Sequence, residues 1–169
     1  MRILVTGGVK SGKSYRALCL ARMEFSGPVS FIATSEIMDE EMQQRIDRHR
    51  SERKRPDGTD EFTTIEEPLD VPAALRRSGG AAIVDCLPMW MNNILYYQKE
   101  NELDAMLDAF IAAMPKDCIV VTNETGLGNI PFDETTRRYN RLLAEANRKI
   151  AAVADRVELL VSGIPLRVK

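Results

Sequence analysis

The first residues that could do chemistry lie close to the N-terminus. Residues 7–14 read G-G-V-K-S-G-K-S and directly follow the apolar run at residues 3–5. This is the complete pattern G-x-x-x-x-G-K-[ST] of a phosphate-binding loop, placed where a first strand should end. Glycine permits the tight turn that points backbone N–H groups at phosphate oxygens. Lys13 can reach the β- and γ-phosphates, and the Ser14 hydroxyl can ligate Mg²⁺. The sequence therefore predicts a nucleoside triphosphate site built by Gly7, Gly8, Val9, Lys10, Ser11, Gly12, Lys13 and Ser14.

Asp85 is the candidate partner of this loop for a metal ion. It ends the apolar run at residues 81–84, and an acid at the end of such a strand positions Mg²⁺ beside a phosphate loop. Open parallel sheets bind ligands outside the carboxyl ends of their strands, so we expect Asp85 to lie near Ser14. The alternative is that Asp85 caps a helix beginning near Pro88.

Polar residues also follow two other candidate strands. Residues 33–35, Ala-Thr-Ser, end the second run and would either face the ligand or cap the next helix. Glu124 follows a later run, at residues 119–121. It is either a general base or second metal contact, or a turn acid beside Gly126, and the sequence leaves this choice open.

The chain has a single histidine, His49, and it lies in a stretch rich in arginine between residues 45 and 55. Helical spacing places His49 on one stripe with Arg45 and Arg53. The positive field of these arginines favours the neutral imidazole near pH 7. Neutral imidazole is a nucleophile, and the arginines would stabilise charge on an attacked phosphate. The alternatives are a solvated helix face and an ordinary surface or core histidine.

The elements that must position these residues alternate between strands and helices. Near-continuous apolar runs predict buried strands at residues 3–5, 29–33, 81–84, 119–121 and 157–161. Helical patterns cover residues 14–25, 36–53, 72–77, 88–97, 103–114 and 133–154. Short strands are expected at 62–65 and 166–168, and a loop at 55–61. This order predicts one α/β domain over residues 1–169. Its fold would be a P-loop NTPase-type three-layer sandwich (RecA-like) with a mainly parallel sheet and helices on both faces.

Composition narrows the class of protein. The chain has 169 residues, a formal net charge of −2 and three cysteines. The cysteines lack C-x-x-C spacing, which argues for reduced, buried thiols and against zinc. We expect no membrane span, because no apolar run reaches about 18 residues, and no signal peptide, because the chain begins with strand and loop. The expected location is therefore the cytoplasm. The net charge argues against a nucleic-acid partner, and thus against a recombinase-like DNA-binding ATPase.

Together these motifs resemble those of a known family over nearly the whole length of the chain. The chain resembles the bifunctional adenosylcobinamide kinase/adenosylcobinamide-phosphate guanylyltransferase family of cobalamin biosynthesis. The R-I-x-x-H element, T-I-E-E-P and D-C-L are more specific to it than the phosphate loop, which many enzymes share. The matching segments are V-T-G-G-V-K-S-G-K-S (5–14), F-I-A-T-S (31–35), D-E-E-M-Q-Q-R-I-D-R-H-R (39–50), T-I-E-E-P (64–68), D-C-L-P-M-W-M-N-N-I-L (85–95), T-N-E-T-G-L-G (122–128) and V-S-G-I-P-L-R-V-K (161–169).

The resemblance implies two reactions and a set of roles. ATP or GTP would phosphorylate the hydroxyl of adenosylcobinamide, and GMP from GTP would then join that phosphate through a guanylyl-histidine at His49. Lys13 would act beside His49 in catalysis, and Ser14 and Asp85 would hold Mg²⁺. The family is also associated with a homotrimer. Beyond the phosphate loop, the implied nucleotide contacts are Ala33, Thr34, Ser35, Arg50, Arg53, Glu66 and Asp85.

Several positions depart from the family pattern. Arg55-Pro56 arrives late after His49, and Pro88 stands where threonine is usual. Residues 141, 144 and 148 of the late helix also differ. These departures leave an alternative open, a P-loop small-molecule kinase that lacks the guanylyl step.

Overall fold

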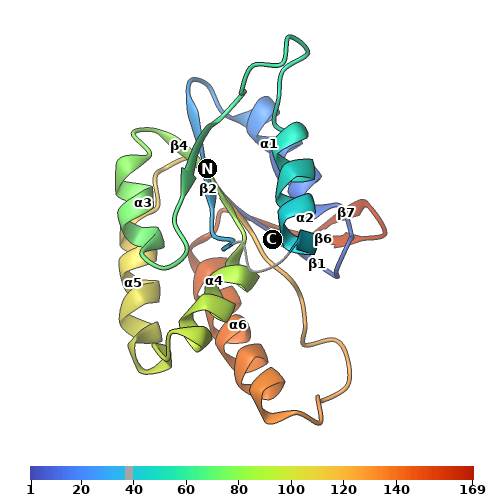
Figure 1. The fold of residues 1–169 in the computed structure, drawn as a ribbon, viewed down its shortest axis with the longest axis vertical. Helices are drawn as coiled ribbons and strands as arrows, with labels where there is room; N and C mark the ends of the chain where they lie inside the picture. The colour runs from blue at the N-terminus through green and yellow to red at the C-terminus, as the bar shows by residue number, and fades with distance from the viewer. Residues whose placement is uncertain (37–39) are drawn as a thin grey trace.

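The computed structural model describes residues 1–36 and 40–169, and within them the chain forms a seven-stranded sheet ordered β3-β2-β4-β5-β1-β6-β7 (Figure 1). Neighbouring strands are parallel except β6 and β7, which are antiparallel. The strands are β1 (Arg2–Gly7), β2 (Val29–Ala33), β3 (Thr63–Glu66), β4 (Ala81–Asp85), β5 (Cys118–Val121), β6 (Arg156–Val161) and β7 (Ile164–Arg167). The helices are α1 (Lys13–Glu24), α2 (Glu40–Ser51), α3 (Val71–Arg77), α4 (Leu87–Tyr96), α5 (Leu103–Ala113) and α6 (Glu134–Val153), with a 3₁₀ turn η1 at Glu100–Glu102.

Helices cover both faces of the sheet, which confirms the predicted three-layer architecture. Figure 1 shows α1 and α2 on one side of the strands and α3, α4, α5 and α6 on the other. Successive side chains of a strand point to opposite faces. In β1, Ile3 and Val5 therefore join the core under α1, whereas Leu4 joins the core under α3 to α6. Because both faces are covered, the central strands are apolar throughout, as the sequence indicated.

Two predicted elements differ in detail. The helix expected over residues 36–53 is shorter, since α2 spans Glu40–Ser51 and Glu36 lies outside it; residues 37–39 fall outside the described part of the chain. The final strand is β7 at Ile164–Arg167 rather than residues 166–168. The long amphipathic helix is confirmed as α6, and its N-cap Asp133 accepts a hydrogen bond from the backbone N–H of Thr136.

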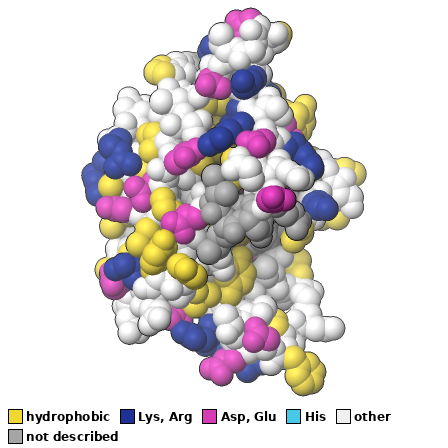
Figure 2. Space-filling model, in the orientation of Figure 1, with side chains coloured by type: hydrophobic (Ala, Val, Ile, Leu, Met, Phe, Trp, Pro, Cys, Tyr) yellow, Lys and Arg dark blue, Asp and Glu magenta, His cyan; other side chains and the backbone are white. Residues whose placement is uncertain are grey.

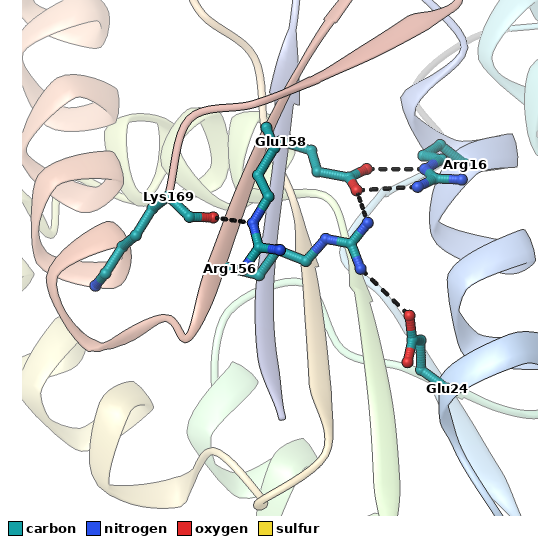
Figure 3. A network of polar contacts seen from close by, with 6 residues as sticks. Arg16, Glu24, Arg156, Glu158 and Lys169 are labelled. Carbon is teal, nitrogen blue, oxygen red and sulfur yellow. Dashed lines mark hydrogen bonds and ion pairs between the residues drawn. The ribbon is translucent and has the colours of Figure 1, made fainter.

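An ionic network centred on the buried Glu158 ties α1 to the sheet, as Figure 3 shows. Glu158 of β6 is only 1% exposed. It accepts hydrogen bonds from Nε and Nη2 of Arg16, at 2.8 and 2.9 Å, and a further one from Arg156. Arg156 also pairs with Glu24 near the end of α1, at 3.2 Å. Since Arg16 stands in the first turns of α1, this network fixes the helix that follows the phosphate loop.

Among the residues that the structure describes, no helix is both long and apolar enough to span a membrane. Figure 2 shows Lys and Arg side chains interspersed with Asp and Glu over the face in view.

Candidate active site

The phosphate loop connects β1 to α1, and two glycines allow its shape. Gly12 has φ of 89° and precedes the first residue of α1, a backbone conformation that L side chains rarely adopt. A Cβ on Gly7 would lie 2.5 Å from the carbonyl oxygen of Leu160. Among the described residues no side chain caps α1, and its first turn contains no acid. The N–H groups and the dipole of this helix end favour an anion there.

Lys13 is held inside the loop. Its side chain is largely buried, with the residue only 8% exposed. Its ammonium group donates to the carbonyl oxygen of Gly8 and lies 3.5 Å from the Ser11 hydroxyl. These oxygens keep the charge at the centre of the loop, where it can meet the phosphates of a nucleotide.

Asp85 connects the loop to the only histidine. The Ser14 hydroxyl lies 3.4 Å from one carboxylate oxygen of Asp85, and His49 Nδ1 lies 3.7 Å from the other. The predicted proximity of Ser14 and Asp85 is therefore present. The alternative role of Asp85 as a helix cap is not, because Cys86 stands at the N-cap of α4. The sequence argument counted only arginines around His49, and the structure adds a carboxylate, so arginines alone do not set the field there.

A cavity of about 580 Å³ opens beside the phosphate loop. This lies within the usual range for small-molecule sites. The cavity is bounded by the loop, by α2 with His49, and by a third wall from α4, the end of β5 and α6. Burial raises the pKa of Tyr139 in this third wall to about 12, so its phenol stays neutral at physiological pH. The third wall consists of Pro88, Met89, Asn92, Val121, Asn123 and Tyr139.

A second, smaller cavity of about 60 Å³ lies on the other side of His49. His49 and Asp85 line both cavities. Arg50 and Glu66 form an ion pair and also line the smaller cavity. The remaining lining residues are Phe31, Ala33, Ser35, Ile46, Arg53 and Cys86.

Arg53 occupies a place that helical spacing did not predict. It lies beyond the end of α2, is only 6% exposed, and stacks its guanidinium over the ring of Phe31 at 3.9 Å. Burial lowers the pKa of Arg53 from its ordinary value, although arginine remains charged at any physiological pH. Arg53 is therefore part of the cavity wall and not of a solvated basic face.

Thr34 and Glu124 have local structural partners. The Thr34 hydroxyl is fully buried and both donates to the carbonyl oxygen of Cys86 (2.8 Å) and accepts from its N–H (3.0 Å). Thr34 thus joins the ends of β2 and β4, while its neighbours Ala33 and Ser35 face the cavity. Glu124 accepts from the N–H of Gly126 at 2.7 Å, which matches the turn-acid alternative.

The residues of the third wall, including Asn123, have no role assigned from the sequence. Asn123 belongs to the polar segment T-N-E-T-G-L-G after a strand, in which only Glu124 is a candidate for chemistry. The signal that could have found it is its place just after a central strand, where ligands of parallel sheets bind.

Comparison with known proteins is consistent with this geometry. The model of the family described as cobinamide kinase / cobinamide phosphate guanyltransferase matches residues 3–168. The chain belongs to this family. It is therefore an enzyme of the kinase and nucleotidyltransferase type, as the resemblance implied.

Curated relatives agree with that assignment, and a solved structure shares the fold. The chain is 38% identical to the bifunctional adenosylcobalamin biosynthesis protein CobP of Pseudomonas aeruginosa, covering 100% of this chain and 98% of the relative. It is 31% identical to CobU of Escherichia coli and 34% identical to CobU of Salmonella typhimurium, over the full length of both. A type III secretion ATPase of pathogenic bacteria matches with a TM-score of 0.54 over 95% of this chain and 51% of that one, at 8% identity. That likeness concerns the P-loop fold alone.

Proposed function

We propose that this chain phosphorylates adenosylcobinamide and then transfers GMP from GTP onto the phosphate, with His49 as the covalent carrier of the guanylyl group. The observation that carries the proposal is the place of His49 between the two cavities, 3.7 Å from Asp85. A triphosphate seated on the phosphate loop brings its α-phosphorus toward this boundary. The nucleoside then extends toward the smaller cavity, which must widen as Arg50 leaves Glu66.

The guanylyl step follows from these contacts. The free nitrogen of neutral His49 attacks the α-phosphorus in line, an N–P bond forms, and the bond to the pyrophosphate oxygen breaks. Lys13 and the N–H groups of the loop stabilise the charge that develops on the departing pyrophosphate. A phosphate oxygen of adenosylcobinamide phosphate then attacks the same phosphorus, and His49 leaves as neutral imidazole.

Mg²⁺ fits the oxygen donors at the loop. One carboxylate and one hydroxyl, those of Asp85 and Ser14, converge at 3.4 Å, and Mg²⁺ is commonly held by one or two such groups together with substrate phosphates. When bound, the ion neutralises charge on the β- and γ-phosphates. We propose the same Ser14 and Asp85 donors for both reactions. The homotrimer and the cytoplasmic location implied by the resemblance stay predictions; light scattering of the purified protein tests the trimer.

Labelled GTP tests the proposal directly. Wild type incubated with α-labelled GTP should retain acid-labile, alkali-stable label after denaturation, and γ-labelled GTP should leave none. The chain has a single histidine, so a phosphoramidate to histidine can form only at His49. His49→Asn should abolish the label, whereas Asp47→Asn, an exposed neighbour on α2, should keep it. Wild type that transfers γ-phosphate to adenosylcobinamide but takes up no α-label would leave a plain kinase and refute the guanylyl step.

A further inference from the structure

Asn123 lines the same cavity as the phosphate loop, His49 and Asp85. Strand β5 lies between β4 and β1 in the sheet. Its last residue, Val121, is in register with Val5, two residues before the phosphate loop, and with the metal-site candidate Asp85. The segment that leaves β5 therefore emerges between the phosphate loop and Asp85, the two groups proposed to hold the β- and γ-phosphates.

Strand geometry turns the Asn123 side chain toward the phosphate loop. Side chains two residues apart point to the same face. Val121 packs in the core under α1, on the phosphate-loop face, and both Val121 and Asn123 line the large cavity. Thr122 points to the opposite face, where it is fully buried and its hydroxyl donates to Asn147 of α6 at 2.7 Å.

The backbone around Asn123 is held from both sides. The N–H groups of Thr122 and Glu124 donate to the carbonyl oxygens of Val5 and Gly7, at 2.9 and 3.1 Å. The Asn147 amide donates to the carbonyl oxygen of Asn123 itself, at 3.0 Å. In contrast, the carboxamide of Asn123 makes no hydrogen bond within residues 1–36 and 40–169. A fixed backbone that presents an unengaged donor and acceptor is preorganised for a ligand.

We propose that Asn123 is a catalytic residue of the kinase reaction, whose amide N–H donates to an oxygen of the transferred γ-phosphoryl group. In that step the acceptor hydroxyl oxygen bonds to the γ-phosphorus and the bond to the β,γ-bridging oxygen breaks. The nucleoside diphosphate leaves with the electron pair, and the hydroxyl proton passes to water. The inference rests on the proposed triphosphate position. The proposal predicts that phosphoryl transfer depends on Asn123 more strongly than guanylyl transfer does. The reason is that His49 attacks the α-phosphorus, whereas Asn123 contacts the γ-phosphoryl group.

The test separates the two reactions in one protein. Asn123→Ala should lower kcat for phosphoryl transfer from γ-labelled GTP to adenosylcobinamide by about 10²–10³-fold, the usual loss for a donor to transition-state charge. Labelling of His49 by α-labelled GTP at saturation, and GMP transfer to supplied adenosylcobinamide phosphate, should fall by less than about 10-fold. Asn123→Asp should impair the kinase at least as strongly, because it places a negative charge against the phosphate. Asn129→Ala, an exposed asparagine in the following loop, should leave both reactions unchanged.

Each result of these assays either supports or overturns the proposed role of Asn123. An unchanged kinase, or equal losses in the kinase and guanylyl reactions of Asn123→Ala, would overturn the role of Asn123. The thermal unfolding midpoint should match wild type, since the carboxamide makes no hydrogen bond within the described part of the chain; a lowered midpoint would mean a structural role instead. Failure of wild type to take up α-label would refute the guanylyl proposal and leave the kinase prediction for Asn123 standing.

Discussion

Glu158→Gln is the most demanding test of how the fold holds the phosphate loop. Glu158 is 1% exposed and accepts from both Arg16 and Arg156. Glutamine keeps the volume but removes the charge, which leaves two guanidinium groups facing a neutral amide. Breaking a buried ion pair from one side costs roughly 3–5 kcal/mol. The arginine side chains retain 23% and 20% exposure and can recover some hydration, so we expect about 3 kcal/mol.

This loss is large enough for ordinary unfolding measurements. For a chain of this size each kcal/mol lowers the unfolding midpoint by roughly 2–4 °C, so the variant should melt about 6–12 °C below wild type. Glu24→Gln is the matched control on the same network. Its ion pair with Arg156 is at the surface, with 32% of the Glu24 side chain exposed, and such pairs contribute at most about 1 kcal/mol.

The stability that Glu158 contributes should decrease as the pH falls. Hydrogen bonds from Arg16 hold the pKa of Glu158 below its ordinary value. Its contribution to stability is therefore complete above the unfolded pKa, about 4.3, and is lost as pH falls through the lower folded pKa. The gap between wild type and Glu158→Gln should be constant near neutral pH and shrink below about pH 4. A gap under about 1 kcal/mol at pH 7, or one that does not shrink in acid, would refute the reasoning.

Three further substitutions have expected results. Lys13→Ala should lower both the kinase and guanylyl activities by at least about 10²-fold, since one charge serves the phosphates in each; survival of either would mean that the triphosphate is misplaced. Thr34→Val should destabilise the fold by about 1–3 kcal/mol in urea unfolding, because it removes the two hydrogen bonds that the buried Thr34 hydroxyl makes with the peptide groups of Cys86; a neutral result would mean that water replaces the hydroxyl. Glu66→Gln should weaken His49 labelling by GTP more than it weakens phosphoryl transfer from ATP, if Glu66 meets the nucleobase; equal losses would place the base elsewhere.

Much of the candidate site could be predicted from local sequence patterns, because the residues of the phosphate loop are contiguous in the chain. The candidate phosphate loop is built from residues 7–14 alone, and the roles predicted for its glycines, lysine and serine depend on backbone geometry within that stretch. The buried strands were recognisable for a similar reason. Strands covered on both faces must be apolar throughout, so β1, β4 and β5 stand out as short apolar runs that end in polar groups.

Helix spacing was less informative around α2. It placed Arg53 on a stripe with His49, but the helix ends at Ser51, and Arg53 turns into the wall over Phe31. Residues 33–35 showed the same limit, because sequence proximity to a strand end does not reveal which side chain bonds to the backbone of Cys86, just after β4. Thr34 does, and Ala33 and Ser35 face the cavity.

By itself the sequence predicted the triphosphate site, the acid proposed for the metal site, the nucleophile candidate and the α/β architecture, because each depends on a short pattern or on a periodicity. The tertiary structure alone decided that Asp85 stands between Ser14 and His49, and that β5 emerges between β1 and β4 with Asn123 at its end. Strand order is the physical reason. Residues far apart in the chain become neighbours only through the pairing of parallel strands, and no local pattern records which strand lies next to which.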